Sequence, residues 1–276
     1  MKQFVKSIPF YIIFFLLITG CTHLPSTQER LASATKLAED AGWTSETIST
    51  SYFDLQAFIP AQRLKNTRLT VFIEGDGLAW ISRSQPSSDP TPLNPVSLKL
   101  ALAYKSDDAV AYLGRPCQFT AHDQKRCTQK YWTSHRFSKE VIIATGEAIT
   151  ALKIMIGASE LQLVGYSGGG AIAALVASRR DDVTRLVTFA GNMNITAWAE
   201  LHHISPLSGS LNPADAVSGL QGIKQIHFVG EHDRVIPAEI VESFQRLLPP
   251  TADSQIIIIP EADHRCCWQQ VIKQMK

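Results

Sequence analysis

GYSGG, at residues 165–169, is the stretch of this chain that decides its fold. The apolar segment 161–164 before it is typical of a buried strand, and the small and apolar residues 171–177 after it favour a helix. At the apex of such a strand–turn–helix a serine hydroxyl is exposed, and the flanking glycines let strand and helix pack closely around it. A glycine-rich turn with an incidental serine is the alternative. The pattern predicts that Ser167 is a nucleophile, with backbone N–H groups of the helix N-terminus nearby.

Two later segments supply a base and an acid for this serine. A serine nucleophile needs a base to take its proton and an acid to orient that base. His264 follows the buried strand expected at 255–260, and Asp233 follows the strand expected at 225–229. Because both come just past strand ends, in the order serine, acid, histidine, we expect a catalytic triad of Ser167, Asp233 and His264.

Other residues compete for these roles. Asp233 would also suit a turn or N-cap position before a helix that Pro237 opens. Glu231 is a rival acid, and Asp263 lies next to the histidine. Three histidines are weaker candidates for the base, namely His202, His203 and His232.

From about Tyr52 to the C-terminus, the chain resembles the α/β-hydrolase superfamily through these motifs. Residues 73–80 (IEGDGLAW) and 114–117 (GRPC) are more narrowly similar to a group of bacterial α/β-hydrolase lipoproteins. The resemblance implies an α/β-hydrolase fold and a reaction of the hydrolase class. It also favours Asp233 as the acid, because G-x-x-D, two apolar residues and a proline resemble the acid loop of the family.

The family also takes an oxyanion-hole N–H from a loop usually written H-G-x or H-G-G-G. Here the strand expected at 69–73 is followed by EGDG, so Glu74 replaces the usual histidine. Because the donor is a backbone group, we expect the N–H groups of Asp76 and Gly168 to form the hole, with either of the two residues after Asp76 as the alternative donor. An acidic side chain here has to point away or pair with a cation, and Arg115 is the candidate partner.

The N-terminus has the features of a bacterial lipoprotein signal peptide. A basic start precedes a nearly continuous apolar run at 8–18, and the sequence ITGC that ends at Cys21 resembles a lipobox. We expect cleavage after residue 20 and lipid on Cys21. The lipid would anchor the protein in a membrane of the cell envelope, with the protein facing the periplasm. Thr22 in place of an aspartate favours the outer membrane. An uncleaved membrane anchor is the alternative, although the run is short for crossing a bilayer.

Four cysteines remain beyond the expected lipid site, and an even number favours disulfides in an exported protein. Cys117 and Cys127 flank a polar loop and can close it easily. Cys266 and Cys267 are neighbours, and a bond between neighbours is strained and rare. The sequence leaves all three pairings open. Metal binding is the rival interpretation, but no C-x-x-C spacing is present, and we expect neither a metal nor another cofactor.

Composition and length favour one α/β domain after the N-terminal region. Hydrophobic residues make up 45% of the chain, enough for a buried sheet, and a net charge of +1 gives no electrostatic reason to expect nucleic acid. Expected strands alternate with expected helices, which predicts a mostly parallel central sheet with helices on both faces and no large cap domain. We divide the chain into a signal peptide (1–20), a tether with an N-terminal helix (21–50) and a hydrolase domain (51–276).

Three long loops, at 78–96, 114–136 and 192–218, are expected to form the walls of the site. Five of their side chains are candidates for an apolar pocket: Trp80, Tyr131, Trp132, Met193 and Trp198. We therefore expect an envelope-anchored serine hydrolase that acts on carboxylic esters of small or lipid-like acyl groups, the choice of esters being an analogy with other members of the fold. A peptidase or amidase, an acyltransferase and a non-catalytic binding lipoprotein remain alternatives.

Overall fold

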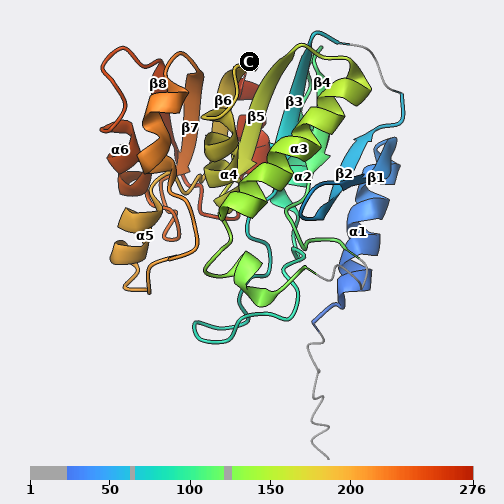
Figure 1. Cartoon of the computed structure of the whole chain (residues 1–276), viewed down its shortest axis with the longest axis horizontal. Helices are drawn as coiled ribbons and strands as arrows, with labels where there is room; N and C mark the ends of the chain where they lie inside the picture. Colours follow the sequence, from blue (N-terminus) through green and yellow to red (C-terminus); the bar gives the residue numbers. More distant parts are fainter. Residues whose placement is uncertain (1–23, 63–65, 121–125, 276) are drawn as a thin grey trace, which may run out of the picture.

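The computed structural model describes residues 24–62, 66–120 and 126–275, so the expected signal peptide and Cys21 lie outside the described residues. An eight-stranded sheet forms its centre, in the order β1-β2-β4-β3-β5-β6-β7-β8 (Figure 1). β1 and β4 pair antiparallel with β2, and all other neighbours are parallel, which confirms the expected mostly parallel sheet. The strands are β1 (Trp43–Ser49), β2 (Asp54–Pro60), β3 (Arg68–Ile73), β4 (Ala109–Leu113), β5 (Glu160–Tyr166), β6 (Val183–Phe189), β7 (Lys224–Gly230) and β8 (Ser254–Ile259).

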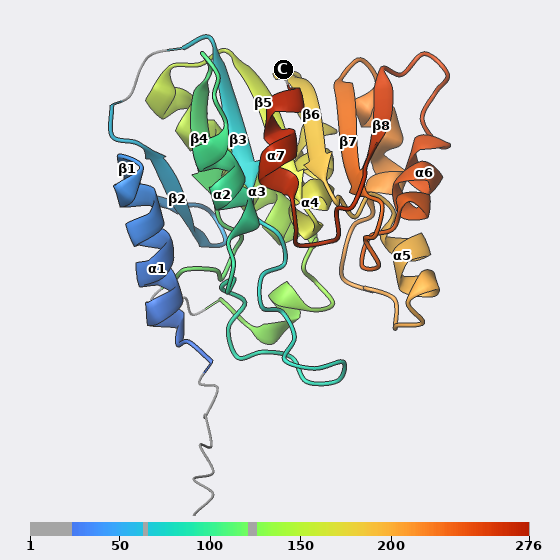
Figure 2. The same ribbon diagram turned by 180° about the vertical axis from the view of Figure 1, so that it is seen from behind.

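Helices cover both faces of the sheet (Figures 1 and 2). On one face, a buried apolar core includes side chains of α3 (Lys139–Ile156), α4 (Gly168–Ala177) and α6 (Ala238–Gln245). A second core on the other face includes side chains of α1 (Thr27–Asp40), α2 (Val96–Ala103) and α7 (Trp268–Val271). α5 (Ile195–Leu201) packs beside α6. The described residues also form three 3₁₀ helices: η1 (Gln129–Trp132), η2 (Pro213–Leu220) and η3 (Ile272–Met275).

Local sequence explains where the long helices begin and end. α1 begins with a capping box, in which the Ser26 side chain accepts the Glu29 N–H and the Glu29 carboxylate accepts the Ser26 N–H at 2.7 Å. α3 ends at Gly157, whose φ of 79° is a left-handed conformation that glycine adopts without strain. The sequence pattern predicts helices at 28–41 and 138–156, and both agree with the structure to within one residue.

Two strands differ from the prediction. β1 was not predicted, and the sheet therefore begins before residue 51, where we placed the start of the hydrolase domain. Its sequence, WTSETIS, buries only Ile48, and it is held in the sheet by its ladder to β2. β8 was predicted as a fully buried strand, but it lies at the open edge of the sheet. Only Ile259 is buried there, and Ile258 is 45% exposed, because an edge strand has a neighbour on one side only.

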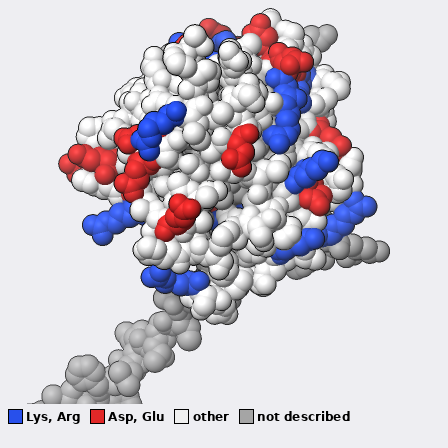
Figure 3. Space-filling view, turned by 60° about the vertical axis from the view of Figure 1, so that its left-hand side comes forward, with Lys and Arg blue, Asp and Glu red and all other residues white. Residues whose placement is uncertain are grey.

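The parallel strands bring distant segments to one edge of the sheet. Their carboxyl ends lie at the lower edge in Figure 1, and the segments 74–95 and 126–138 extend below it. Segments that follow β3, β5, β7 and β8 therefore meet at this edge, where ligands bind in open α/β sheets. Among the described residues, no helix combines the length and the apolar character needed to cross a bilayer. On the face shown in Figure 3, acidic and basic side chains are interspersed.

Candidate active site

Ser167 lies in the turn between β5 and α4 with a strained backbone. Its φ of 52° and ψ of −121° are unusual for a residue with a side chain, and such a conformation costs on the order of 1–3 kcal/mol. Backbone hydrogen bonds hold it there: the Ser167 N–H donates to the Phe189 carbonyl at 2.9 Å, and the Ser167 carbonyl accepts the Asn192 N–H at 3.1 Å. The turn is therefore fixed by β6 and the segment after it.

Two glycines let α4 approach the sheet at this turn. A methyl group on Gly165 would overlap the backbone of Gly169, and a methyl group on Gly169 would overlap the carbonyl oxygen of Ile73 at the end of β3. The space around the serine is thus filled by backbone, as the GYSGG pattern predicts.

His264 connects Ser167 to Asp233. Its Nε2 lies 3.1 Å from Ser167 Oγ, and its Nδ1 lies 2.8 Å from Asp233 Oδ2. The second oxygen of Asp233 accepts the N–H groups of Val235 and Ile236, each at 2.8 Å, and the carboxylate is fully buried. The three side chains predicted from the sequence therefore meet in one hydrogen-bonded row at the carboxyl edge of the sheet.

The rival acids are engaged elsewhere. Asp263 accepts the N–H groups of Arg265 and Cys266, both at 2.7 Å, and these bonds lower the pKa of its carboxyl group. Glu231 accepts the Glu261 N–H at 3.2 Å. Asp233 is thus the acid that the structure places beside the histidine.

The rival histidines also have other neighbours. His202 Nε2 lies 2.9 Å from the Val235 carbonyl, and His232 Nε2 lies 3.6 Å from the Glu261 carboxylate. The exposed side chains of Glu231, His232 and Glu261 bring one potential metal-ligand atom each within 4.8 Å of one another, but exposed acidic groups commonly gather without a metal.

Glu74, which replaces the usual histidine of the oxyanion loop, is buried. Its carboxylate accepts the Gly75 N–H at 2.9 Å and the Tyr112 hydroxyl at 3.2 Å. Burial raises the pKa of Glu74 to about 7, because desolvation disfavours the charged form. This acid is therefore directed towards β4.

Asp76 is the acidic side chain that pairs with Arg115, the cation predicted for this loop. A second cation, Arg136, donates from Nη1 to Asp76 Oδ2 at 2.9 Å. Burial alone would raise the pKa of Asp76, but the charges of the two arginines bring the pKa below its ordinary value. Sequence reasoning missed Arg136, since nothing in the polar segment before α3 distinguishes it from a surface arginine.

The three candidate oxyanion donors of this loop differ in their bonding. The Leu78 N–H already donates to the Pro90 carbonyl at 3.0 Å, which removes it as a donor to substrate. Within the described residues, the Asp76 N–H has no hydrogen-bond partner. This leaves Asp76 and Gly77 as the candidates, with Gly168 at the N-terminus of α4.

Of the five candidate pocket residues, Tyr131 and Trp132 line a small hollow together with Asp76 and Arg115. Met193 and Trp132 are buried, and the Trp132 indole donates to the Ser87 carbonyl at 3.1 Å. The Trp198 indole donates to the Val235 carbonyl at 2.8 Å, and Tyr131 packs edge-on against Phe53. Trp80 is 43% exposed.

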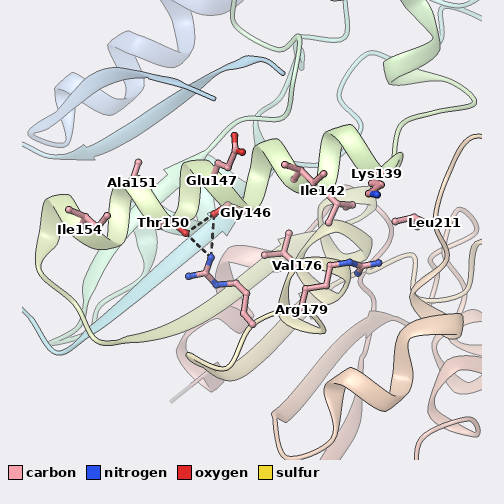
Figure 4. Close-up of a pocket in the computed structure, with 12 residues that line it drawn as sticks. Lys139, Ile142, Gly146, Glu147, Thr150, Ala151, Ile154, Val176, Arg179 and Leu211 are labelled. Carbon is pink, nitrogen blue, oxygen red and sulfur yellow. Dashed lines mark hydrogen bonds between the residues drawn. The ribbon is translucent and has the colours of Figure 1, made fainter. Parts of the chain in front are cut away.

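One well-formed cavity among the described residues lies away from Ser167, His264 and Asp233. It measures about 620 Å³ and lies between α3 and the C-terminal end of α4 (Figure 4). Its lining includes Ile142, Ile154, Val176 and Arg179, but none of Ser167, Asp233 and His264. We therefore assign the site from the hydrogen-bonded side chains and not from this cavity.

Both cysteine pairs form disulfides. Cys117 is bonded to Cys127, as the short polar loop between them allows, and the neighbours Cys266 and Cys267 are bonded to each other. The sequence left this pairing open. The first bond begins two residues after Arg115, and the second begins two residues after His264.

Comparisons with known proteins agree with this architecture. Est1E from Butyrivibrio proteoclasticus has a TM-score of 0.59 and 14% identity, covering 84% of this chain and 95% of that chain. The Pyrococcus furiosus esterase Pf2001 has a TM-score of 0.61 and 10% identity, covering 86% and 90%. A putative lipase (lip1) from Acinetobacter baumannii has a TM-score of 0.59 and 14% identity, covering 93% and 96%. At these identities the likeness shows the fold.

A search of curated proteins found no match. A family model does match: residues 111–270, more than half of the chain, fit the dienelactone hydrolase family. The matched region contains the GYSGG turn and the segments that carry Asp233 and His264. The chain is therefore an α/β hydrolase that belongs to the dienelactone hydrolase family.

Proposed function

We propose that this protein is a serine hydrolase that cleaves carboxylic esters, with Ser167, His264 and Asp233 as its catalytic residues. The hydrogen-bonded row from Asp233 through His264 to Ser167 is the observation that supports this most. A carboxylate only accepts hydrogen bonds, so Asp233 fixes the imidazole proton on Nδ1 and leaves Nε2 as the acceptor for the serine proton.

The reaction then follows from this arrangement. Ser167 Oγ attacks the ester carbonyl while its proton moves to His264 Nε2, and the backbone N–H groups of Gly168 and Asp76 stabilise the oxyanion. Collapse of the tetrahedral intermediate breaks the ester C–O bond, and the leaving alkoxide takes the proton from Nε2. Water, deprotonated by His264, attacks the acyl-enzyme and releases the carboxylic acid. Throughout, Asp233 stabilises the imidazolium.

We propose esters and not amides as substrates by analogy with other proteins of this fold. Two of the solved structures that share this fold are named as an esterase and a putative lipase, and the described part of the chain contains no long insertion that would form a large cap domain. A substrate with a small or lipid-like acyl group fits this proposal.

The attachment of the protein to the cell envelope is a separate proposal that depends on the N-terminal sequence alone. Cys21 would carry the lipid, and the hydrolase domain would face the periplasm from the outer membrane. Metabolic labelling with a radioactive fatty acid, compared between the wild type and Cys21→Ser, tests it. Equal incorporation in both proteins would contradict it.

Covalent labelling tests the enzyme proposal directly. The full-length chain, purified in detergent, is treated with a fluorophosphonate probe beside Ser167→Ala. We expect labelling of the wild type only. Equal labelling of both proteins, or of neither, contradicts the proposal. A panel of p-nitrophenyl esters with short to long acyl chains, run beside p-nitroanilides, then separates an esterase from an amidase.

A further inference from the structure

A buried ion cluster lies beside the nucleophile turn, and the reaction steps above do not use it. It consists of Asp76, Arg115 and Arg136, with Arg115 on Asp76 Oδ1 and Arg136 on Oδ2. Arg115 follows β4, Arg136 precedes α3, and Asp76 follows β3, so three segments join at one carboxylate. The two arginines are only 4% and 5% exposed.

The cluster touches the turn that holds Ser167. A methyl group on Gly168 would overlap the Oδ1 atom of Asp76 and would lie 2.9 Å from Arg115 Nη1. The carboxylate is therefore packed directly against the residue whose N–H is a proposed oxyanion donor. The electrostatic interaction with His264 also lowers the pKa of Asp76, although less than the two arginines do.

Without its two arginine partners, the Asp76 carboxylate beside Gly168 would disfavour the reaction. Negative charge develops on the substrate oxygen in the transition state, and like charges repel strongly where water is excluded. Two guanidinium groups against one carboxylate instead leave a net positive charge beside the oxyanion.

We propose that Arg115 and Arg136 are positioning residues of the oxyanion hole. They neutralise Asp76 and hold its side chain against Gly168, which fixes the spacing of the two donor N–H groups. This inference rests on the proposed hydrolase function and adds to it the residues that make an acidic oxyanion loop compatible with catalysis.

Arg136 is the better residue for a test. The Arg115 side chain also donates from Nη2 to the Arg136 carbonyl, so its loss would release the segment before α3 as well. The guanidinium of Arg136 lies over the Trp198 ring, 5.0 Å from its centroid, and its Nε has no hydrogen-bond partner among the described residues. A long apolar side chain can therefore take its place.

The experiment compares four variants of the full-length chain with the wild type: Arg136→Lys, Arg136→Met, Asp76→Asn and the double variant Arg136→Met/Asp76→Asn. Arg136→Met leaves Asp76 with one cation, and we expect kcat to fall about 10- to 100-fold with little change in KM, somewhat less than the loss of a direct oxyanion donor. Arg136→Lys keeps a cation and should retain most of the activity. The double variant removes the carboxylate as well and should recover most of the lost kcat.

The recovery in the double variant is the decisive result, because a merely structural role of Arg136 would make two substitutions worse than one. A wild-type kcat in Arg136→Met, or a double variant no better than Arg136→Met, overturns the inference. Arg136→Gln is made in parallel, so that a Met variant that does not fold still leaves a neutral replacement. Failure of the fluorophosphonate to label the wild type would instead contradict the hydrolase function itself.

Discussion

The hydroxyl of Tyr166 donates a 2.7 Å hydrogen bond to the backbone carbonyl of His264. Tyr166, which directly precedes the proposed nucleophile Ser167, thus fixes the backbone of His264, the proposed base. The Trp268 indole donates to the same carbonyl at 3.1 Å, and the Tyr166 ring lies 5.3 Å from the imidazole, centroid to centroid. The position of His264 is therefore tied to β5 and α7, although its own segment lies at the edge of the sheet.

Removal of this hydroxyl should reduce activity without loss of the fold. Tyr166→Phe keeps the ring contact and removes one hydrogen bond, worth about 1 kcal/mol, so we expect kcat to fall about fivefold. Tyr52→Phe, at an exposed tyrosine, is the matched control. Steady-state kinetics on a p-nitrophenyl ester measure both, and equal kcat values would show that the bond does not position the histidine.

The identity of the acid can be tested by three amide substitutions. Asp233→Asn keeps the size of the side chain but presents the wrong partner to His264 Nδ1, and we expect kcat to fall about 10⁴-fold. Glu231→Gln and Asp263→Asn, at the two rival acids, should stay within about threefold of the wild type, since surface substitutions have small effects. If kcat fell further in either control than in Asp233→Asn, the control residue and not Asp233 would be the catalytic acid.

Burial of Glu74 should make stability depend on pH. The pKa of this carboxyl is raised from 4.5 to about 7, so between these values the folded state binds more protons than the unfolded state. Stability from this group is complete below about pH 4.5 and is lost as pH rises through 7, with a total of about 3 kcal/mol. Glu74→Gln cannot titrate.

Urea unfolding of the wild type and Glu74→Gln at several pH values measures this effect. The free energy of unfolding of the wild type should fall relative to that of the variant as pH rises from 4.5 to 7. A difference that stays constant over this range would contradict the raised pKa.

Two glycine-to-alanine substitutions test the packing of the nucleophile turn. Gly165→Ala places a methyl group on the backbone of Gly169, so we expect a destabilisation of several kcal/mol or no folded protein. Gly146→Ala, inside α3, has open space around the added methyl group and should stabilise the protein by about 0.5–1 kcal/mol. Thermal denaturation followed by circular dichroism compares the two, and similar melting temperatures would show that the turn tolerates a side chain.

Most of the sheet could be predicted because its signals are local. Buried parallel strands such as β5 and β7 are mostly apolar runs, and α3 ends at a glycine. β1 has no such run, since an edge strand needs to bury only part of one face and is fixed by its partner. The isoleucines of β8 predicted burial, yet their exposure depends on where the sheet ends, which no local pattern encodes.

The sequence by itself determined the nucleophile turn and the order of Ser167, Asp233 and His264, because each lies within five residues of a strand end in a recognisable short motif. Only the tertiary structure decided which charges meet around that turn. Arg136 and Asp76 are 60 residues apart, and an ion pair between them depends on how β3, β4 and α3 pack. The pairing of Glu74 with Tyr112 has the same origin. Side-chain partners at such separations are set by the packing of the whole sheet, whereas turns and strand ends are set by neighbouring residues.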